Sequence, residues 1–408
     1  MGWPAATSTL RHFGFLTQEQ RSRLFAVPPQ AFDRGSPPAR LALALGATLY
    51  SPGTRHTLAR DAERAAAIGT TSMVWCLEDA IAHEAVPGAE RTVAAALRSL
   101  AVGAGQVALP LLFVRVRTPE QVPRLLALAG HRGAAALAGF VLPKFDPASG
   151  DEFLSAVEAA SEQTGRRLYA MPVLETPALA WRETRGATLA ELRELCDAHR
   201  DTVLALRVGA TDLCGLFGLR RDRDTTIWDV AVVRDVLADI VNVFGRRGDY
   251  LLTGAVWEHV GGARLRKPQL RSTPFEGVAG QRLRAQLVRD DVDELMREVA
   301  LDGANGFTGK TVIHPAHVSV VNALLTVTRA EYDDALTVLA GRSTGGVSAS
   351  AGGETMLEFG PHALWAEQVS ARAALYGVLA EPGALVELLA AGQEVALRRY
   401  ASARPLVP

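Results

Sequence analysis

The feature that most constrains the fold of this 408-residue chain is a regular alternation of apolar runs and helix-length segments that begins at residue 41. Short apolar runs are typical of parallel strands buried on both faces, and the segments between them are typical of crossover helices. Eight runs are predicted to be strands, at residues 47–50, 73–77, 111–116, 139–142, 168–174, 203–208, 250–256 and, for the eighth, near 306–307 or 311–313. Seven helical patterns lie at residues 57–67, 87–100, 119–128, 150–164, 189–199, 226–244 and 281–300. The alternation predicts an α/β fold, a (β/α)8 TIM barrel, with a doubly wound open sheet as the alternative.

The remaining segments are predicted to extend the barrel at both ends. Residues 1–40 are irregular and interrupted by prolines, which indicates an N-terminal arm packed on the main domain. Residues 41–330 are expected to form the barrel, and residues 331–408 a helical C-terminal extension that acts as a lid or an oligomer contact. A loop at residues 260–278, rich in glycine and charge, is interpreted as an insertion that binds a phosphate-bearing substrate or is simply solvated.

The composition argues against several classes of function. A net charge of -1 gives no basis for a general nucleic-acid or membrane-surface partner, and no run approaches 18 apolar residues. The start of the sequence does not resemble a signal peptide. Three cysteines without a C-x-x-C pair indicate a reducing cytoplasm and no zinc site. The run at residues 305–311 is similar to a phosphate loop, but Ala304 stands where that motif needs glycine.

Charged or polar side chains follow nearly every predicted strand. The carboxyl ends of barrel strands meet at one mouth, so we expect these side chains to line an active site. Two of the three lysines of the chain are among them. The charged and imidazole groups are Arg55, Glu78, Asp79, Arg115, Arg117, Lys144, Glu175, Asp212, Glu258, Lys310 and His314.

Glu175 and Asp212 end two successive predicted strands, with a helix-length segment between them. This places two hard oxygen ligands about one barrel position apart. Mg²⁺ commonly takes one or two protein carboxylates and leaves its other positions to water and substrate. The two residues are therefore predicted to bind Mg²⁺; the alternative is that they only cap the helices that follow.

Seven short motifs occur in a characteristic order: Ser51-Pro-Gly-Thr-Arg55, Leu77-Glu-Asp-Ala80, Phe113-Val-Arg-Val116, Val141-Leu-Pro-Lys144, Val173-Leu-Glu-Thr176, Gly209-Ala-Thr-Asp-Leu213 and Gly306-Phe-Thr-Gly-Lys-Thr-Val-Ile-His-Pro315. Together they resemble the citrate lyase β-subunit and malyl-CoA lyase group of the HpcH/HpaI aldolase superfamily. The resemblance covers about residues 45–330 and looks like that of a divergent, stand-alone branch.

This resemblance implies roles for particular residues. Glu175 and Asp212 would hold Mg²⁺, with Mn²⁺ as an alternative, and Arg115 would grip the carboxylate of a keto acid. Glu78 and Asp79 would support a metal-bound water and the acid–base network. Lys144 is expected to be a catalytic residue as well. The expected substrate-binding residues are Arg55, Arg115, Gly209, Ala210 and Thr211.

The implied reaction is retro-Claisen or aldol cleavage of a carbon–carbon bond in a hydroxy acid or its CoA thioester, through a metal-stabilised enolate. The expected partner is a small carboxylic acid or acyl-CoA, bound by a cytoplasmic homo-oligomer. A thioesterase or condensing enzyme with the same Mg²⁺ site is one alternative. A barrel that has lost turnover and serves as a binding or scaffold subunit is another. The joint presence of the acidic residues and Arg115 argues against the last of these.

Overall fold

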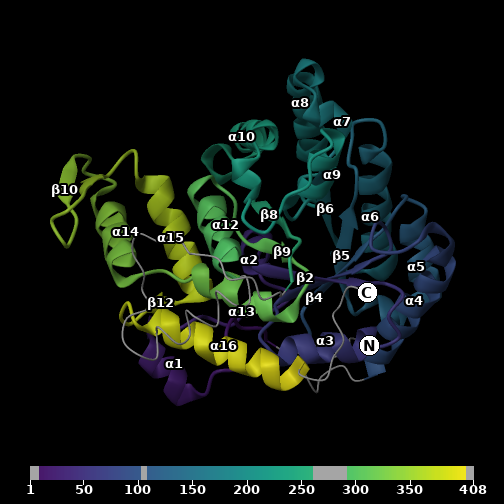
Figure 1. Ribbon diagram of the computed structural model, residues 1–408, viewed down its shortest axis with the longest axis horizontal. Coiled ribbons are helices and arrows are strands. Elements are labelled where there is room, and N and C mark those ends of the chain that lie inside the picture. Colours follow the sequence, from purple (N-terminus) through teal and green to yellow (C-terminus); the bar gives the residue numbers. More distant parts are fainter. Residues whose placement is uncertain (1–8, 103–107, 261–291, 401–408) are drawn as a thin grey trace.

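The computed structural model describes residues 9–102, 108–260 and 292–400 (Figure 1). Eight parallel strands close into a barrel in sequence order. They are β2 (Ala47–Pro52), β3 (Ser72–Cys76), β4 (Leu111–Arg115), β5 (Leu137–Leu142), β6 (Tyr169–Leu174), β7 (Leu206–Val208), β8 (Leu252–Trp257) and β9 (Lys310–Val312). The TIM barrel is confirmed and the open sheet is wrong, because β9 pairs with β2. Of the two places predicted for the eighth strand, the later one is right.

The strands form because their apolar residues are covered on both sides. Every residue of β5 and β6 is buried, as expected for strands with the barrel interior on one face and helices on the other. The helix α6, for example, buries Phe153, Leu154 and Val157 along one stripe and ends at Gly165, whose φ of +64° favours glycine. The covering helices are α3 (Leu58–Ala67), α4 (Val86–Val102), α5 (Gln121–Ala134), α6 (Gly150–Thr164), α7 (Pro177–Ala180), α8 (Arg182–Ala198), α9 (Ala210–Leu216), α10 (Ala231–Phe244), α12 (Asp293–Ala304) and α13 (Pro315–Leu324).

Parts of the N-terminal arm and of the C-terminal extension pack together near the amino ends of the barrel strands, whereas α16 (Ala384–Tyr400) packs along α13. The arm contains α1 (Gln18–Leu24), β1 (Phe25–Val27) and α2 (Pro38–Ala44), and β1 pairs antiparallel with β12 (Val378–Leu379). The Tyr376 hydroxyl donates to the carbonyl of Leu43, just before β2 begins, and the Tyr376 ring stacks on His12 at 4.1 Å. These contacts hold the arm and the extension near the amino ends of the strands.

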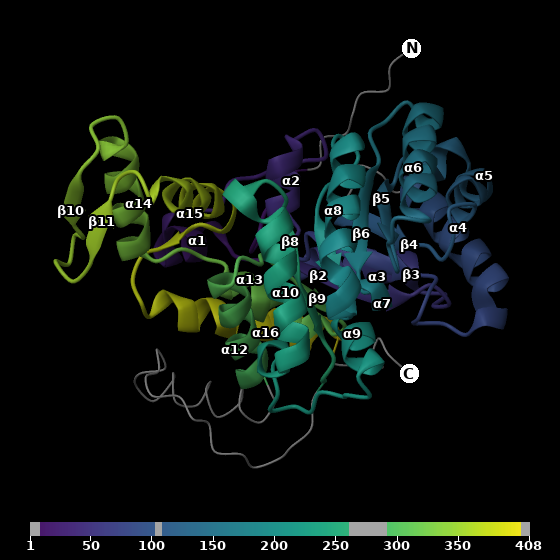
Figure 2. The same cartoon turned by 90° about the horizontal axis from the view of Figure 1, so that it is seen from above.

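The extension consists of α14 (Arg329–Gly341), a hairpin of β10 (Val347–Ala349) and β11 (Met356–Glu358), α15 (Ala363–Tyr376), β12 and α16 (Ala384–Tyr400). Figure 2 shows α14 and the hairpin to one side of the barrel. The helix α15 packs on α2 and on η3 (Arg246–Gly248), which precede strands. In this chain α14, the hairpin and α15 therefore lie away from the mouth of their own barrel. An oligomer contact by this extension stays a prediction.

Two further expectations concern the loop at residues 260–278 and membrane-spanning helices. The proposed insertion at residues 260–278 lies outside the described residues, apart from Val260. In the part of the chain that the structure describes, no helix combines the length and apolar character needed to cross a membrane.

Candidate active site

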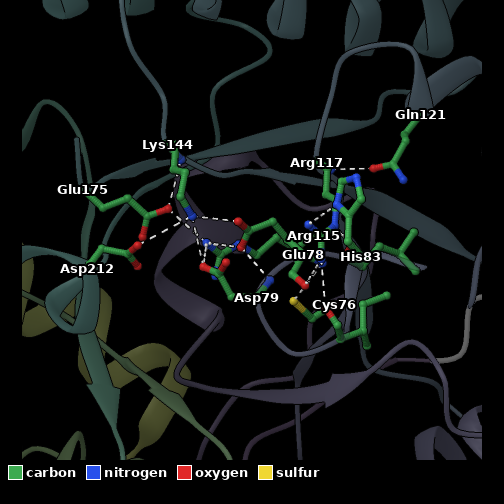
Figure 3. A network of polar contacts seen from close by, with 12 residues as sticks. Cys76, Glu78, Asp79, His83, Arg115, Arg117, Gln121, Lys144, Glu175 and Asp212 are labelled. Carbon is green, nitrogen blue, oxygen red and sulfur yellow. Dashed lines mark hydrogen bonds and ion pairs between the residues drawn. The ribbon is translucent and has the colours of Figure 1, made fainter. Parts of the chain in front are cut away.

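Six charged side chains converge at the carboxyl ends of five consecutive strands (Figure 3). Two residues follow β3, one ends β4, one follows β5, one follows β6 and one lies in the first turn of α9, after β7. The barrel thus brings together residues that are up to 134 positions apart in the sequence, as its closed parallel topology requires. We call them the mouth cluster: Glu78, Asp79, Arg115, Lys144, Glu175 and Asp212.

Arg115 connects three carboxylates of this cluster. Its Nη2 lies 2.7 Å from Glu78 Oε2, 2.9 Å from Glu175 Oε1 and 3.4 Å from Asp79 Oδ2. Burial disfavours the guanidinium charge, but Glu175 and other nearby groups raise the pKa of Arg115 above its ordinary value, so it stays protonated. Its Nε is buried and has no acceptor among the described residues. The expected binding of a substrate carboxylate by Arg115 remains a prediction.

Lys144 connects the cluster through both its backbone and its side chain. Its backbone N–H donates to Glu175 Oε1 at 2.9 Å, and its Nζ lies 2.7 Å from Glu78 Oε1, 3.1 Å from Asp79 Oδ2 and 3.5 Å from Asp212 Oδ1. Its φ of +47° is unusual for a residue other than glycine. Such backbone strain persists only where the surroundings hold it, and here the Glu175 carboxylate does so.

The pKa values of three carboxyl groups in the mouth cluster are shifted in different directions. Burial raises the pKa of Glu175 from 4.5 to about 7, against the opposing effect of Arg115. Burial also raises the pKa of Glu78. Although burial opposes it, contact with Glu78 and Lys144 lowers the pKa of Asp79 below its ordinary value. Two adjacent carboxylates are thus pushed apart in proton affinity, an arrangement typical of acid–base sites.

The residues expected to bind substrate differ from one another in burial and in hydrogen-bond partners. A Cβ at Gly209 would stand 1.7 Å from Glu175 Oε2, so this glycine is required to make room for the carboxylate. Ala210 is buried, and Thr211 Oγ1 donates to Glu258 Oε1 at 2.5 Å. Arg55 is paired through Nε with Asp61 Oδ2 at 3.1 Å, and among the described residues no hydrogen bond or ion pair joins it to the mouth cluster. Substrate binding by these residues remains a prediction.

The donor set of the mouth cluster fits Mg²⁺. The N-caps of α7 and α9 are Thr176 and Gly209, so neither Glu175 nor Asp212 is itself an N-cap, but Asp212 lies in the first turn of α9, where a negative charge is favourable. Four carboxylates share two cations, which leaves two negative charges when all are ionised. The described residues contain no group of three or more His, Cys, Asp or Glu side chains placed to hold a metal ion. Two carboxylates with open positions for water suit Mg²⁺ rather than a closed structural site.

The interpretation of Lys310 as a mouth residue is wrong. Lys310 is the first residue of β9, beside Ala47 at the start of β2, and its side chain is fully buried. Its Nζ lies 2.7 Å from Glu298 Oε1 and 2.7 Å from Asp302 Oδ2, both on α12. Lys310 is expected from the sequence to follow the eighth strand. It instead begins that strand, so it lies at the amino end of the barrel and not at the mouth. With Arg221, these residues form what we call the sealed cluster: Arg221, Glu298, Asp302 and Lys310.

Two polar residues at the mouth, Arg117 and Glu258, are expected there from the sequence, but the sequence indicates no role for either. Arg117 contacts the backbone of the loop that carries Glu78, and Glu258 accepts from Thr211. The alternation of Arg115 and Arg117 at the end of one strand is the only sequence signal that could have singled out Arg117.

Comparison with known proteins gives results at the level of family and fold. The CitE protein of Mycobacterium tuberculosis, solved with magnesium, acetoacetate and coenzyme A, is 23% identical with a TM-score of 0.50, over 81% of this chain and 99% of that one. RipC from Yersinia pestis is 18% identical with a TM-score of 0.44, over 71% of this chain and 99% of that one. The magnesium and glyoxylate complex of Haloferax volcanii malate synthase is 13% identical with a TM-score of 0.48, over 68% and 74%.

No curated protein matches the sequence. The similarity to the CitE protein shows a shared fold. A family model described as C–C bond lyase of the TIM-barrel fold matches residues 39–378, which span the whole barrel and most of the extension. That match confirms the lyase relationship indicated by the sequence motifs. The chain belongs to this C–C bond lyase family of TIM-barrel proteins.

Proposed function

We propose that this protein cleaves a carbon–carbon bond in a hydroxy acid or its CoA thioester, with Mg²⁺ as cofactor and Mn²⁺ as an alternative. The observation that carries the proposal is the mouth cluster, in which a buried Glu175 and a half-buried Asp212 sit among acidic and basic groups with two negative charges in excess. Membership of a C–C bond lyase family supports the reaction type. The ligands of the CitE protein, which shares the fold, support the choice of substrates for testing.

Glu175 and Asp212 are the residues that would hold the metal ion. When bound, Mg²⁺ would supply a Lewis acid for the negative charge that develops on a substrate oxygen. Gly209 leaves the space in which the Glu175 carboxylate lies, and the Lys144 backbone N–H fixes one of its oxygens. These contacts orient the ligand before a metal arrives, which is what preorganised sites require.

The other members of the mouth cluster are assigned to substrate binding and proton transfer. Arg115 has a buried Nε donor that is free of partners among the described residues, and its planar fork suits a carboxylate. We assign Asp79, whose side chain is 52% exposed and whose lowered pKa keeps it ionised, to accept the proton of a substrate hydroxyl. Lys144 keeps Asp79 ionised through its Nζ contact.

The cellular location and the assembly of the protein belong to the same proposal. The three free cysteines, Cys76, Cys196 and Cys214, are all buried, which is consistent with a reducing cytoplasm. The extension at α14, α15 and the hairpin is assigned to contact between copies of the chain. Neither aspect affects the assignment of the mouth cluster.

The test is metal-dependent turnover of a panel of small hydroxy acids and their CoA esters. We expect carbonyl-containing cleavage products that require Mg²⁺ and disappear with EDTA, and that are absent in Glu175→Gln and Asp212→Asn. The variant Arg132→Gln, altered at an exposed position of the outer helix α5, is the control. Release of free CoA without cleavage of the acyl carbon skeleton would instead identify a thioesterase. Equal turnover with and without metal would refute the proposal.

A further inference from the structure

The loop between β3 and η1 (His83–Ala85) carries Glu78 and Asp79 but forms no strand or helix of its own. Backbone carbonyls in such a segment must find partners elsewhere, because unpaired buried acceptors are costly. The direction in which Glu78 and Asp79 point therefore depends on whatever binds this backbone. Any residue that does so controls two of the four carboxylates of the mouth cluster.

Arg117 binds three carbonyl groups of this loop. Its Nε donates to the carbonyl of Leu77 at 2.7 Å, and its Nη2 donates to those of Glu78 at 2.7 Å and Ile81 at 2.9 Å. Its Nη1 lies 3.3 Å from His83 Nδ1. One planar guanidinium thus binds loop carbonyls on both sides of Asp79.

The outer helices hold Arg117 in turn. Its backbone N–H donates to Gln121 Oε1 at 2.5 Å, and Gln121 Nε2 donates to Glu90 Oε1 at 2.7 Å. Glu90, on α4, is paired with Arg124 of α5 at 3.0 Å. The loop of the mouth cluster is therefore connected through Arg117 to the packed layer of helices.

The two arginines at and just after the end of β4, Arg115 and Arg117, make different kinds of contact. Arg115 contacts the carboxylates themselves, whereas Arg117 contacts the backbone from which two of them project. We propose that Arg117 is a positioning residue, which holds residues 77–81 so that Glu78 and Asp79 face Arg115 and Lys144. Its catalytic importance rests on the proposed function, but the positioning itself does not require a metal. Lysine cannot replace it, because an ammonium group lacks the fixed fork of donors.

The first test measures hydrogen exchange of the full-length, metal-free protein. In Arg117→Gln we expect the backbone amides of residues 77–82 to exchange at least tenfold faster than in the wild type. Arg117→Lys, which keeps the charge, should show the same direction of change if Arg117→Gln folds poorly. Arg132→Gln is the matched control, since it removes a charge from an exposed position of α5 outside the contacts that hold Arg117. Unchanged exchange at residues 77–82 in both Arg117 variants would overturn the inference.

The second test separates positioning from general structural support. Mg²⁺ alone is titrated into Arg117→Gln, into the double variant Glu78→Gln with Asp79→Asn, and into the triple variant. We expect Arg117→Gln to weaken Mg²⁺ binding about fivefold in the wild-type background and not at all in the double variant, because residues that act through one another are not additive. An equal loss in both backgrounds would contradict positioning through the acidic pair.

The two proposals fail in different ways. If Mg²⁺ binding survives both Glu175→Ala and Asp212→Ala, the metal assignment is lost, and hydrogen exchange alone then decides the case of Arg117. If those variants lose Mg²⁺ but Arg117→Gln exchanges and binds like the wild type, the metal site stands and the Arg117 inference is wrong.

Discussion

The mouth cluster and the sealed cluster use the same kinds of side chains but differ in charge balance and in access to solvent. In the sealed cluster two carboxylates meet two cations, and all four side chains are between 0% and 4% exposed. In the mouth cluster four carboxylates meet two cations, and Lys144, Asp79 and Asp212 are 49%, 52% and 30% exposed. The sealed cluster balances its own charges and is buried, although Arg221 also contacts Glu258 at 3.3 Å, whereas the mouth cluster has more negative than positive charge and is partly exposed.

The two clusters also differ in how their carboxylates are bound. Each sealed carboxylate has protein partners: Glu298 is held by Lys310, Arg221 and the Ile227 N–H, and Asp302 by Lys310 and the Trp228 indole. The mouth cluster instead leaves Glu175 with its pKa raised to about 7 by burial and Lys144 with a left-handed backbone. Perturbed carboxyl pKa values and backbone strain of this kind cluster at functional sites.

The largest expected effect is on the sealed cluster. Lys310→Met should lower the free energy of unfolding by about 3–5 kcal/mol, because it leaves Glu298 and Asp302 buried without their shared cation. Urea unfolding followed by circular dichroism measures this loss. Lys144→Met, which removes the lysine at the mouth, is the comparison and should cost much less. Equal destabilisation by the two substitutions would erase the distinction between the clusters.

The next effect concerns catalysis at the mouth. Arg115→Lys should reduce kcat/KM nearly as much as Arg115→Ala, by about 2–3 kcal/mol of transition-state binding, because a point charge cannot replace a planar fork. The measurement is steady-state kinetics with whichever member of the panel is turned over. The free energy of unfolding of Arg115→Lys serves as the control. Near-normal kcat/KM in the lysine variant would give Arg115 a different role.

A smaller effect is expected in the pH dependence of stability. The unfolded chain releases the Glu175 proton near pH 4.5, whereas the folded, metal-free protein keeps it to about pH 7. The folded state binds more protons in that window, so its stability should fall as pH rises from 4.5 to 7, by no more than about 1.4 kcal/mol per pH unit. Glu175→Gln should flatten this slope. Thermal unfolding at a series of pH values checks it, and an unchanged slope in the variant would contradict the assigned pKa.

The smallest effect returns to the sealed cluster. Trp228 Nε1 donates to Asp302 Oδ1 at 2.8 Å, and its ring meets Phe307 edge-on at 5.7 Å. Trp228→Phe keeps the ring contact but removes the hydrogen bond, and should cost about 1–2 kcal/mol of stability. Mg²⁺ binding should not change. A variant that is fully stable but loses Mg²⁺ would mean that the sealed cluster takes part in the site.

The sequence predicted the barrel well because apolar runs mark strands that are buried on both faces, as β5 and β6 are. It also placed Glu175 and Asp212 at successive strand ends, since that depends only on strand order. It misplaced Lys310 because a shift of a few residues decides whether a side chain starts or ends a strand. The role of Arg117 could not be predicted, because it depends on where three loop carbonyls point. The left-handed backbone of Lys144 carries no sequence signal either.

The central claim is that the open, negatively charged mouth cluster is a Mg²⁺ site held by Glu175 and Asp212. The most direct measurement is calorimetric titration of Mg²⁺ into the folded wild type, Glu175→Ala and Asp212→Ala, with Trp228→Phe as the control from the sealed cluster. The wild type and Trp228→Phe should bind one ion with the same affinity, and each mouth variant should bind at least tenfold more weakly while remaining folded. Unchanged affinity in both mouth variants would contradict the claim.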